Sequence, residues 1–231
     1  MKTITTIVAL FFTFLSSAQD VNADAIIQQV VSKFNTVKDY SVDASIRANI
    51  PLIKIMPVNA SIYFKQKDKF KVVSKGIAIL PKQGFTDVNA FLMKKGSYMA
   101  VSGGIKTIEG VKTNLISVIP TGETSEIILA KLWIDPARDV IIRSQVTTRS
   151  SGTVLVDYTY GPEVAYGLPS QLVFTIDVKK FKMPKSVAAD LNKTDNQKKK
   201  TADKDQKGTI TIKLTNYKVN KGINDAVFKE K

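Results

Sequence analysis

Residues 24–49 read DAIIQQVVSKFNTVKDYSVDASIRAN, and the spacing of the apolar residues changes within this stretch. As far as Val37, apolar side chains recur every three or four residues, which places them on one stripe of a helix. From Val42 onward they recur every second residue, which is the period of a strand with one buried face. We therefore expect an amphipathic helix over 24–38, with Asp24 as its N-cap, followed directly by a strand.

The period of two continues through most of the remaining chain. Short connections such as 135–139 and 150–152 contain Asp, Pro, Ser or Gly, residues that favour turns between adjacent strands. Many strands this close together in the sequence favour an antiparallel meander. The runs that we predict as strands cover 42–48, 60–64, 70–74, 111–119, 127–134, 140–148, 154–160, 172–178 and 210–219.

Two stretches depart from this alternation. Residues 127–134 are apolar on both faces, so we expect this strand to be covered on both sides or to lie where the sheet curls. Residues 76–96 are apolar without a clean period. We interpret them as a strand end and an irregular flap with one helical turn over 87–93, or as an ordinary loop that covers the core.

The N-terminus has the pattern of a secretory signal peptide over residues 1–18. Lys2 precedes a mostly apolar run that is too short to span a bilayer, and Ser16-Ser17-Ala18 offers small residues for cleavage. No Cys follows the run, which excludes a lipid anchor made through an N-terminal Cys. We expect residues 19–231 to form a single exported domain.

The chain contains neither Cys nor His, and this excludes several classes of site. Disulfides, Cys- or His-ligated metals, Ser-His-Asp triads and Cys nucleophiles are all impossible. Asp135 and Asp139 flank a turn, and Asp157 is placed to form an ion pair with Arg143 or Arg47 across the sheet. We therefore expect no enzyme, no cofactor and no metal site.

The net charge is +14, and much of it lies in one Lys-rich stretch. Between residues 179 and 207 there are ten Lys and four Asp, a local charge of 10 − 4 = +6. We predict a mobile loop over about 182–208, because this segment has few apolar residues with which to form a core. It is either a solvated loop or a segment attracted to anionic lipid headgroups. Without interleaved aromatic residues, it does not favour nucleic acid.

Several segments that together extend over the whole mature chain have the pattern of one known family. The opening helix is followed by the aromatic and basic stretch Tyr63 to Phe70. Leu132-Trp133-Ile134-Asp135 precedes Val140, and Asn216 to Asn220 is followed by Asp225 to Phe228. These segments resemble, respectively, the strand and turn, the Trp-Ile-Asp hairpin and the terminal segment of the LolA/LolB-like outer-membrane lipoprotein-sorting proteins.

This resemblance implies a fold and a function. The implied fold is α+β, mainly β: an incomplete antiparallel β-barrel, in which a strongly curved sheet carries the N-terminal helix on its concave face. The implied function is that of a periplasmic carrier or acceptor for lipids or lipoproteins, with acyl chains held in an apolar cavity between helix and sheet. The expected partners are these acyl chains, with transient contact to an anionic membrane surface or to envelope proteins, and the protein is expected to be a monomer.

The alternating pattern supplies candidates for the cavity wall, although the same residues would also suit an ordinary filled core. They are Ile46, Ile62, Phe64, Phe70, Leu92, Met93, Trp133, Leu172, Phe174 and Ile176. The candidates for contact with headgroups or polar parts of the cargo are Arg47, Lys65, Gln66 and Lys67. A filled interior would instead favour a non-catalytic envelope adaptor that uses the same half-barrel as a docking surface.

The signal peptide gives a direct prediction. Expressed in a bacterium with its leader, the protein should be recovered from the periplasm with Gln19 as its first residue, because cleavage follows the small residue Ala18. Intact-mass spectrometry measures this, and a chain that retains residues 1–18 would contradict it.

Overall fold

The computed structural model describes residues 22–51, 55–66, 69–74, 87–150, 152–177 and 207–229. Within these ranges, no helix is long and apolar enough to cross a membrane. The elements are α1 (Ala23–Asn35), β1 (Asp39–Asn49), β2 (Val58–Lys65), β3 (Lys69–Ser74), α3 (Asp87–Met93), β4 (Tyr98–Ile108), β5 (Val111–Pro120), β6 (Ile127–Asp135), β7 (Val140–Thr148), β8 (Gly152–Tyr160), η1 (Pro162–Tyr166), β9 (Pro169–Asp177), β10 (Lys207–Val219) and η2 (Asp225–Phe228).

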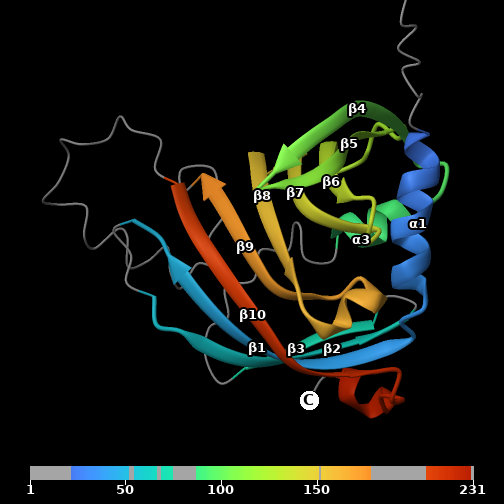
Figure 1. Cartoon of the computed structure of the whole chain (residues 1–231). Coiled ribbons are helices and arrows are strands. Elements are labelled where there is room, and N and C mark those ends of the chain that lie inside the picture. The colour runs from blue at the N-terminus through green and yellow to red at the C-terminus, as the bar shows by residue number, and fades with distance from the viewer. Residues whose placement is uncertain are drawn as a thin grey trace, which may run out of the picture.

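The ten strands form one antiparallel sheet in the order β3-β2-β1-β10-β9-β8-β7-β6-β5-β4. The last strand, β10, lies between β1 and β9 and so joins the first three strands to the other six. The end strands β3 and β4 do not pair with each other, so the sheet curls without closing into a barrel (Figure 1). This confirms the predicted incomplete antiparallel barrel with one N-terminal helix.

Helix α1 forms because its apolar residues share one face. Ala23, Ile27, Val30 and Val31 are buried, as the three- and four-residue spacing predicted. The N-cap was wrong by two residues: the side chain of Asn22, and not that of Asp24, accepts from the backbone N–H of Ala25 at 3.0 Å. Asp24 lies instead in the first turn, where its negative charge complements the positive end of the helix dipole.

The core has two parts, and α1 joins them. The N-terminal half of α1 packs with α3 and the inner face of β4–β7, in a cluster that includes Ile27 and Leu132. Phe34, near the end of α1, packs instead on the cluster formed by β1, β2 and β8–β10. Tyr158 contacts both clusters. The helix therefore covers the sheet across the boundary between the two halves.

The sequence left two alternatives for strand β6, cover on both faces or a position where the sheet curls, and the structure does not show the first. Ala130, Leu132 and Ile134 are fully buried on the inner face. On the other face, Trp133 is only partly buried, and Ile128 keeps 46% of its surface exposed. The described residues therefore leave the second apolar face of β6 partly in contact with solvent.

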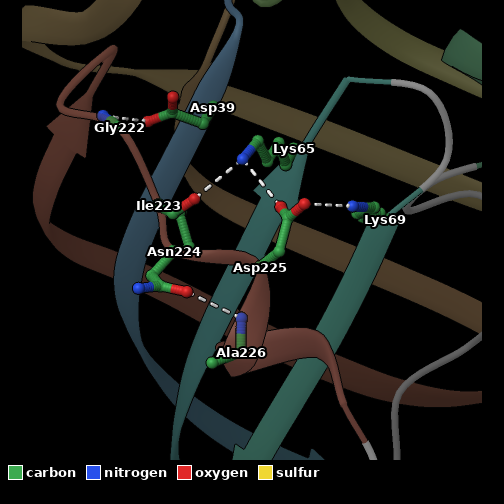
Figure 2. A network of polar contacts seen from close by, with 8 residues as sticks. All are labelled: Asp39, Lys65, Lys69, Gly222, Ile223, Asn224, Asp225 and Ala226. Atoms are coloured by element: carbon green, nitrogen blue, oxygen red, sulfur yellow. Dashed lines mark hydrogen bonds and ion pairs between the residues drawn. The ribbon is translucent and has the colours of Figure 1, made fainter.

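Residues 222–225, which follow β10, are bound to β1, β2 and β3 by hydrogen bonds and ion pairs (Figure 2). We call these residues the C-terminal segment. Lys65 Nζ donates to the carbonyl of Ile223 at 2.9 Å and to Asp225 Oδ1 at 2.7 Å, and Lys69 Nζ lies 2.9 Å from Asp225 Oδ2. The carboxylate of buried Asp39 accepts from the backbone N–H of Gly222 at 3.0 Å. We call the set of Lys65, Lys69 and Asp225 the C-terminal clasp.

The first stability prediction concerns α1. Ile27→Ala should lower the free energy of unfolding by about 2–4 kcal/mol, because it removes a fully buried side chain and leaves a void between helix and sheet. Chemical denaturation followed by circular dichroism measures the difference. Gln29→Ala, on the exposed face of the same helix, is the matched control and should change stability by less than about 0.5 kcal/mol.

The second prediction concerns the clasp. Hydrogen bonds from Lys65 and Lys69 lower the pKa of Asp225 to about 2. Because this pKa lies below the ordinary value, the clasp stabilises the fold above about pH 4, and its contribution disappears as the pH falls through about 2. In the double variant Lys65→Met, Lys69→Met, carboxyl NMR titration should show the pKa of Asp225 returned to about 4.

Lys71→Met is the control for the clasp, because Lys71 Nζ donates to the carbonyl of Lys229 at 2.7 Å and not to Asp225. An unchanged Asp225 titration in the double variant would show that the two lysines do not set its pKa.

Candidate functional site

The inner face of the sheet, over whose β4–β7 half α1 and α3 pack, is the candidate site. Ile46, Ile62, Leu172, Phe174 and Ile176 all lie on it and are at most 3% exposed. They come from β1, β2 and β9 and belong to one cluster, because alternate residues of neighbouring antiparallel strands point to the same side. Leu92, from α3, is equally buried in the second cluster. The six predicted wall residues are therefore divided between two buried apolar clusters, and Tyr158 contacts both clusters.

The aromatic candidates lie near one end of this face. Phe64 stacks on Tyr40 with ring centroids 5.2 Å apart and contacts Phe34 of α1 at 5.7 Å. Phe70 is the cross-strand partner of Phe64 and keeps 37% of its surface exposed. Aromatic side chains therefore link the end of α1 to the edge of the sheet formed by β2 and β3.

Two predicted wall residues lie elsewhere. Trp133 points to the outer face, because it lies between Leu132 and Ile134, whose side chains are buried on the inner face. Its cross-strand neighbours are Leu115 and Arg143. Met93, the last residue of α3, is 42% exposed. Trp133 is therefore not on the inner face, because a strand that is apolar on both faces does not reveal in the sequence which side turns inward.

The predicted polar contacts do not gather in one place. Arg47 is exposed on the outer face of β1. Lys65 belongs to the C-terminal clasp, and Gln66 Nε2 donates to the carbonyl of Asn35 at 3.0 Å, at the end of α1. Lys67 lies outside the described residues. At the end of β2, Lys65 therefore binds the C-terminal segment. The next residue, Gln66, binds the end of helix α1.

Asn220 is a key residue that sequence reasoning missed. Its Oδ1 accepts from the backbone N–H of Lys38 at 2.7 Å, and its Nδ2 donates to the carbonyl of Thr36 at 3.0 Å. Asn220 itself adopts a left-handed backbone with φ of 55°, a conformation that Asn tolerates better than most residues. No local signal could have found it, because its partners lie more than 180 residues away.

The polar groups near the inner face satisfy one another. Ser144 Oγ and Tyr158 Oη lie 3.0 Å apart, and Tyr160 Oη donates to the carbonyl of Ile141 at 2.8 Å. Burial raises the pKa of Tyr158 to about 12, so this hydroxyl stays neutral at physiological pH. Among the described residues, no buried side-chain nitrogen or oxygen lacks a hydrogen-bond partner. The inner face therefore consists of apolar side chains together with neutral hydroxyl groups that already have hydrogen-bond partners.

The charged groups lie on the outer face. Asp157 pairs with Arg143, one of the two partners predicted for it. Asp135 accepts from Arg138 Nε at 2.6 Å and from the backbone N–H of Ala137, as predicted for a turn residue. Burial opposes ionisation of Asp135, but these bonds outweigh it and lower its pKa.

A separate hollow of about 480 Å³ lies over β1, β2 and β10. Asp43 is one of its polar lining residues, and its carboxylate accepts from Asn216 Nδ2 at 3.0 Å and from Ser61 Oγ at 3.4 Å. Such a polar lining does not suit hydrocarbon, so the inner face remains the candidate for apolar ligands. The residues that line the hollow are Ser41, Val42, Asp43, Ser61, Tyr63, Asn216, Tyr217 and Lys218.

Comparison by sequence finds no match, because no protein-family model and no curated protein matches this chain. Comparison by structure does find similar folds. A LolA superfamily protein from Nitrosomonas europaea superimposes with a TM-score of 0.59 at 11% identity, covering 90% of this chain and 97% of that one.

Two further solved structures are similar. An outer membrane lipoprotein-sorting protein domain from Vibrio parahaemolyticus gives a TM-score of 0.60 at 8% identity, covering 89% of this chain and 95% of that one. A DUF1329 family protein from Desulfovibrio piger gives 0.54 at 11% identity, with 90% and 97% covered. The chain thus has the fold of LolA superfamily proteins, as its resemblance in sequence to lipoprotein-sorting proteins predicted.

Proposed function

We propose that this protein is a non-catalytic carrier or acceptor that holds the acyl chains of lipids or lipoproteins against the inner face of its sheet, after export to the periplasm. The observation that carries the proposal is the apolar, uncharged inner face of a sheet that does not close. The Vibrio parahaemolyticus domain with the same fold is described as a lipoprotein-sorting domain, which supports lipoprotein acyl chains as cargo.

The free energy gained by burying an acyl chain is comparable to the free energy needed to move α1 away from the sheet. Burying an acyl chain of about 14 methylenes stabilises the complex by roughly 10 kcal/mol before ordering costs, at about 0.8 kcal/mol per methylene. Exposing Ile27, Val30 and Val31 of α1 would cost about 5–9 kcal/mol, at about 1.5–3 kcal/mol per side chain. One acyl chain can therefore replace the contacts of the helix that covers the inner face.

The two ends of α1 are held differently, which favours opening at its start. The far end is tied by Gln66 to the carbonyl of Asn35 and by Asn220 to that of Thr36. The N-terminal half rests on the sheet through apolar side chains such as Ile27 and Val30. Apolar contacts have no fixed direction, so cargo can replace them without leaving a polar group unpaired.

A ligand-binding experiment tests the proposal. Ala44 and Ala60 are cross-strand partners on β1 and β2, and both are buried on the inner face with small side chains. Ala44→Leu should reduce the binding of a fluorescent fatty-acid probe at least fivefold, because it fills the space that hydrocarbon would occupy. Probe titration measures the affinity, and thermal unfolding checks that the variant is folded.

Ser45→Leu is the matched control, since Ser45 is the next residue of β1 and points to the outer face. Its probe affinity should equal that of the unchanged protein. Native mass spectrometry of the gently purified protein should also show co-purifying lipid. A protein that is consistently empty and does not bind the probe would refute the carrier function.

A further inference from the structure

Exposed apolar side chains are concentrated on the outer face of β4, β5 and β6. Met99 is 57% exposed, Val101 50%, Ile128 46% and Ile119 38%. These are high values for large apolar residues on a sheet. We call the outer patch these four residues together with their partly exposed neighbours Leu115, Leu129 and Trp133.

The register of the strands brings the residues of the outer patch together on neighbouring strands, with Ser117 and Lys131 among them. Met99 of β4 faces Ile119 of β5, and Leu115 of β5 faces Trp133 of β6. Leu115 also lies over Gly103 of β4, where an added Cβ would be only 2.8 Å from Leu115 Cγ. The patch therefore extends across three strands, which is typical of a contact surface rather than of scattered exposed residues.

The charges around the outer patch are mainly positive. Lys106 of β4 and Lys131 of β6 lie on the same face, paired with Thr113 and Ser117 of β5, respectively. Lys94 and Lys95 precede β4 and are exposed. The one acidic residue of these three strands, Asp135, is already bound to Arg138 at 2.6 Å.

The acidic residues of the nearby turns change this balance little. Glu109 pairs with Arg143 at 3.4 Å, and the Glu126 carboxylate accepts from the backbone N–H of Ser150 at 3.0 Å. Glu123 is the remaining exposed carboxylate of the connection between β5 and β6. An apolar patch with lysines within it and beside it suits a membrane that is apolar inside and negatively charged at its surface.

We infer that the outer patch docks the protein on an anionic lipid bilayer, with Met99, Val101 and Ile119 entering the headgroup region and the lysines binding lipid phosphates. A second copy is a poor occupant, because the full chain has a net charge of +14 and the lysines of two facing patches would repel each other. An anionic membrane complements both the apolar residues and the lysines.

The place of the outer patch in the fold fits this role. Strand β4 forms one end of the sheet and contacts α1 (Figure 1). The patch thus lies at the rim where the helical cover meets the sheet, and docking there would bring the start of α1 close to the bilayer. The biological role of this docking rests on the proposed carrier function, but the contact with the membrane can be tested separately.

Vesicle co-sedimentation of the mature protein is the test. The protein should bind vesicles of 30% phosphatidylglycerol in phosphatidylcholine, bind pure phosphatidylcholine much less, and be released by 0.5 M NaCl. Two double variants are compared: one carries Met99→Ser and Val101→Ser, and the other carries Lys106→Gln and Lys131→Gln. Each should weaken vesicle binding at least fivefold. This corresponds to the loss of one or more contacts with the membrane.

Val73→Ser is the matched control, because Val73 is 50% exposed but lies on β3, at the opposite end of the sheet. It should bind vesicles like the unchanged protein. A triple variant tests the Lys-rich segment; it carries Lys198→Gln, Lys199→Gln and Lys200→Gln. This variant should retain most of the vesicle binding.

Three outcomes would overturn the inference. These are no binding to phosphatidylglycerol vesicles, equal binding by the Met99→Ser, Val101→Ser variant, or binding lost only when Lys198–Lys200 are changed. The first would leave a protein partner as the occupant of the patch. Because these substitutions lie outside the inner face, their fatty-acid probe affinity should be unchanged, which separates failure of docking from failure of the carrier function.

Discussion

Strand β10 pairs with β1 on one side and with β9 on the other, and the continuity of the inner face depends on this double pairing. Strand β1 comes near the start of the described chain and β10 near its end, so the contact closes a loop of more than 150 residues. The entropic cost of such a closure grows only slowly with loop length, and many ladder hydrogen bonds and inner-face contacts such as Ile46 with Ile212 offset it. Without β10, the β1–β3 and β4–β9 segments would be separate sheets.

The ends and irregularities of this ladder fix how the helix sits on the sheet. The register of β1 and β10 shifts between Ser41 and Asp43, and Asn216 beside the shift has a positive φ of 59°. Just beyond β10, the Asn220 side chain binds backbone groups that follow α1. The start of β1 and the end of α1 are therefore held by the far end of the chain.

The two faces of the sheet have different physical roles. The inner face combines fully buried aliphatic residues with neutral, paired hydroxyls such as that of Tyr158, so it can exchange one apolar partner for another. On the outer face, the ion pair between Arg143 and Asp157 lies beside the exposed patch of β4–β6. A carrier of hydrocarbon needs this separation, because any unpaired charge inside would oppose the entry of an acyl chain.

The sequence by itself determined the N-terminal helix and nine of the ten strands, since apolar periods of 3.6 and two follow directly from local geometry. It left a helical turn or a loop as alternatives at 87–93, and the open half-barrel was implied by the family resemblance and not by the periodicity. Strand β4 was missed because Gly103, Gly104 and exposed Met99 and Val101 break the usual alternation. Five of the ten predicted wall residues lie deeply buried on the inner face of the sheet and a sixth, Leu92, is buried on α3, whereas Trp133 lies on the outer face. Only the tertiary structure decided which side of β6 turned inward, and that Gln66, Asn220 and Asp225 join segments far apart in sequence, because these contacts depend on how distant strands pair.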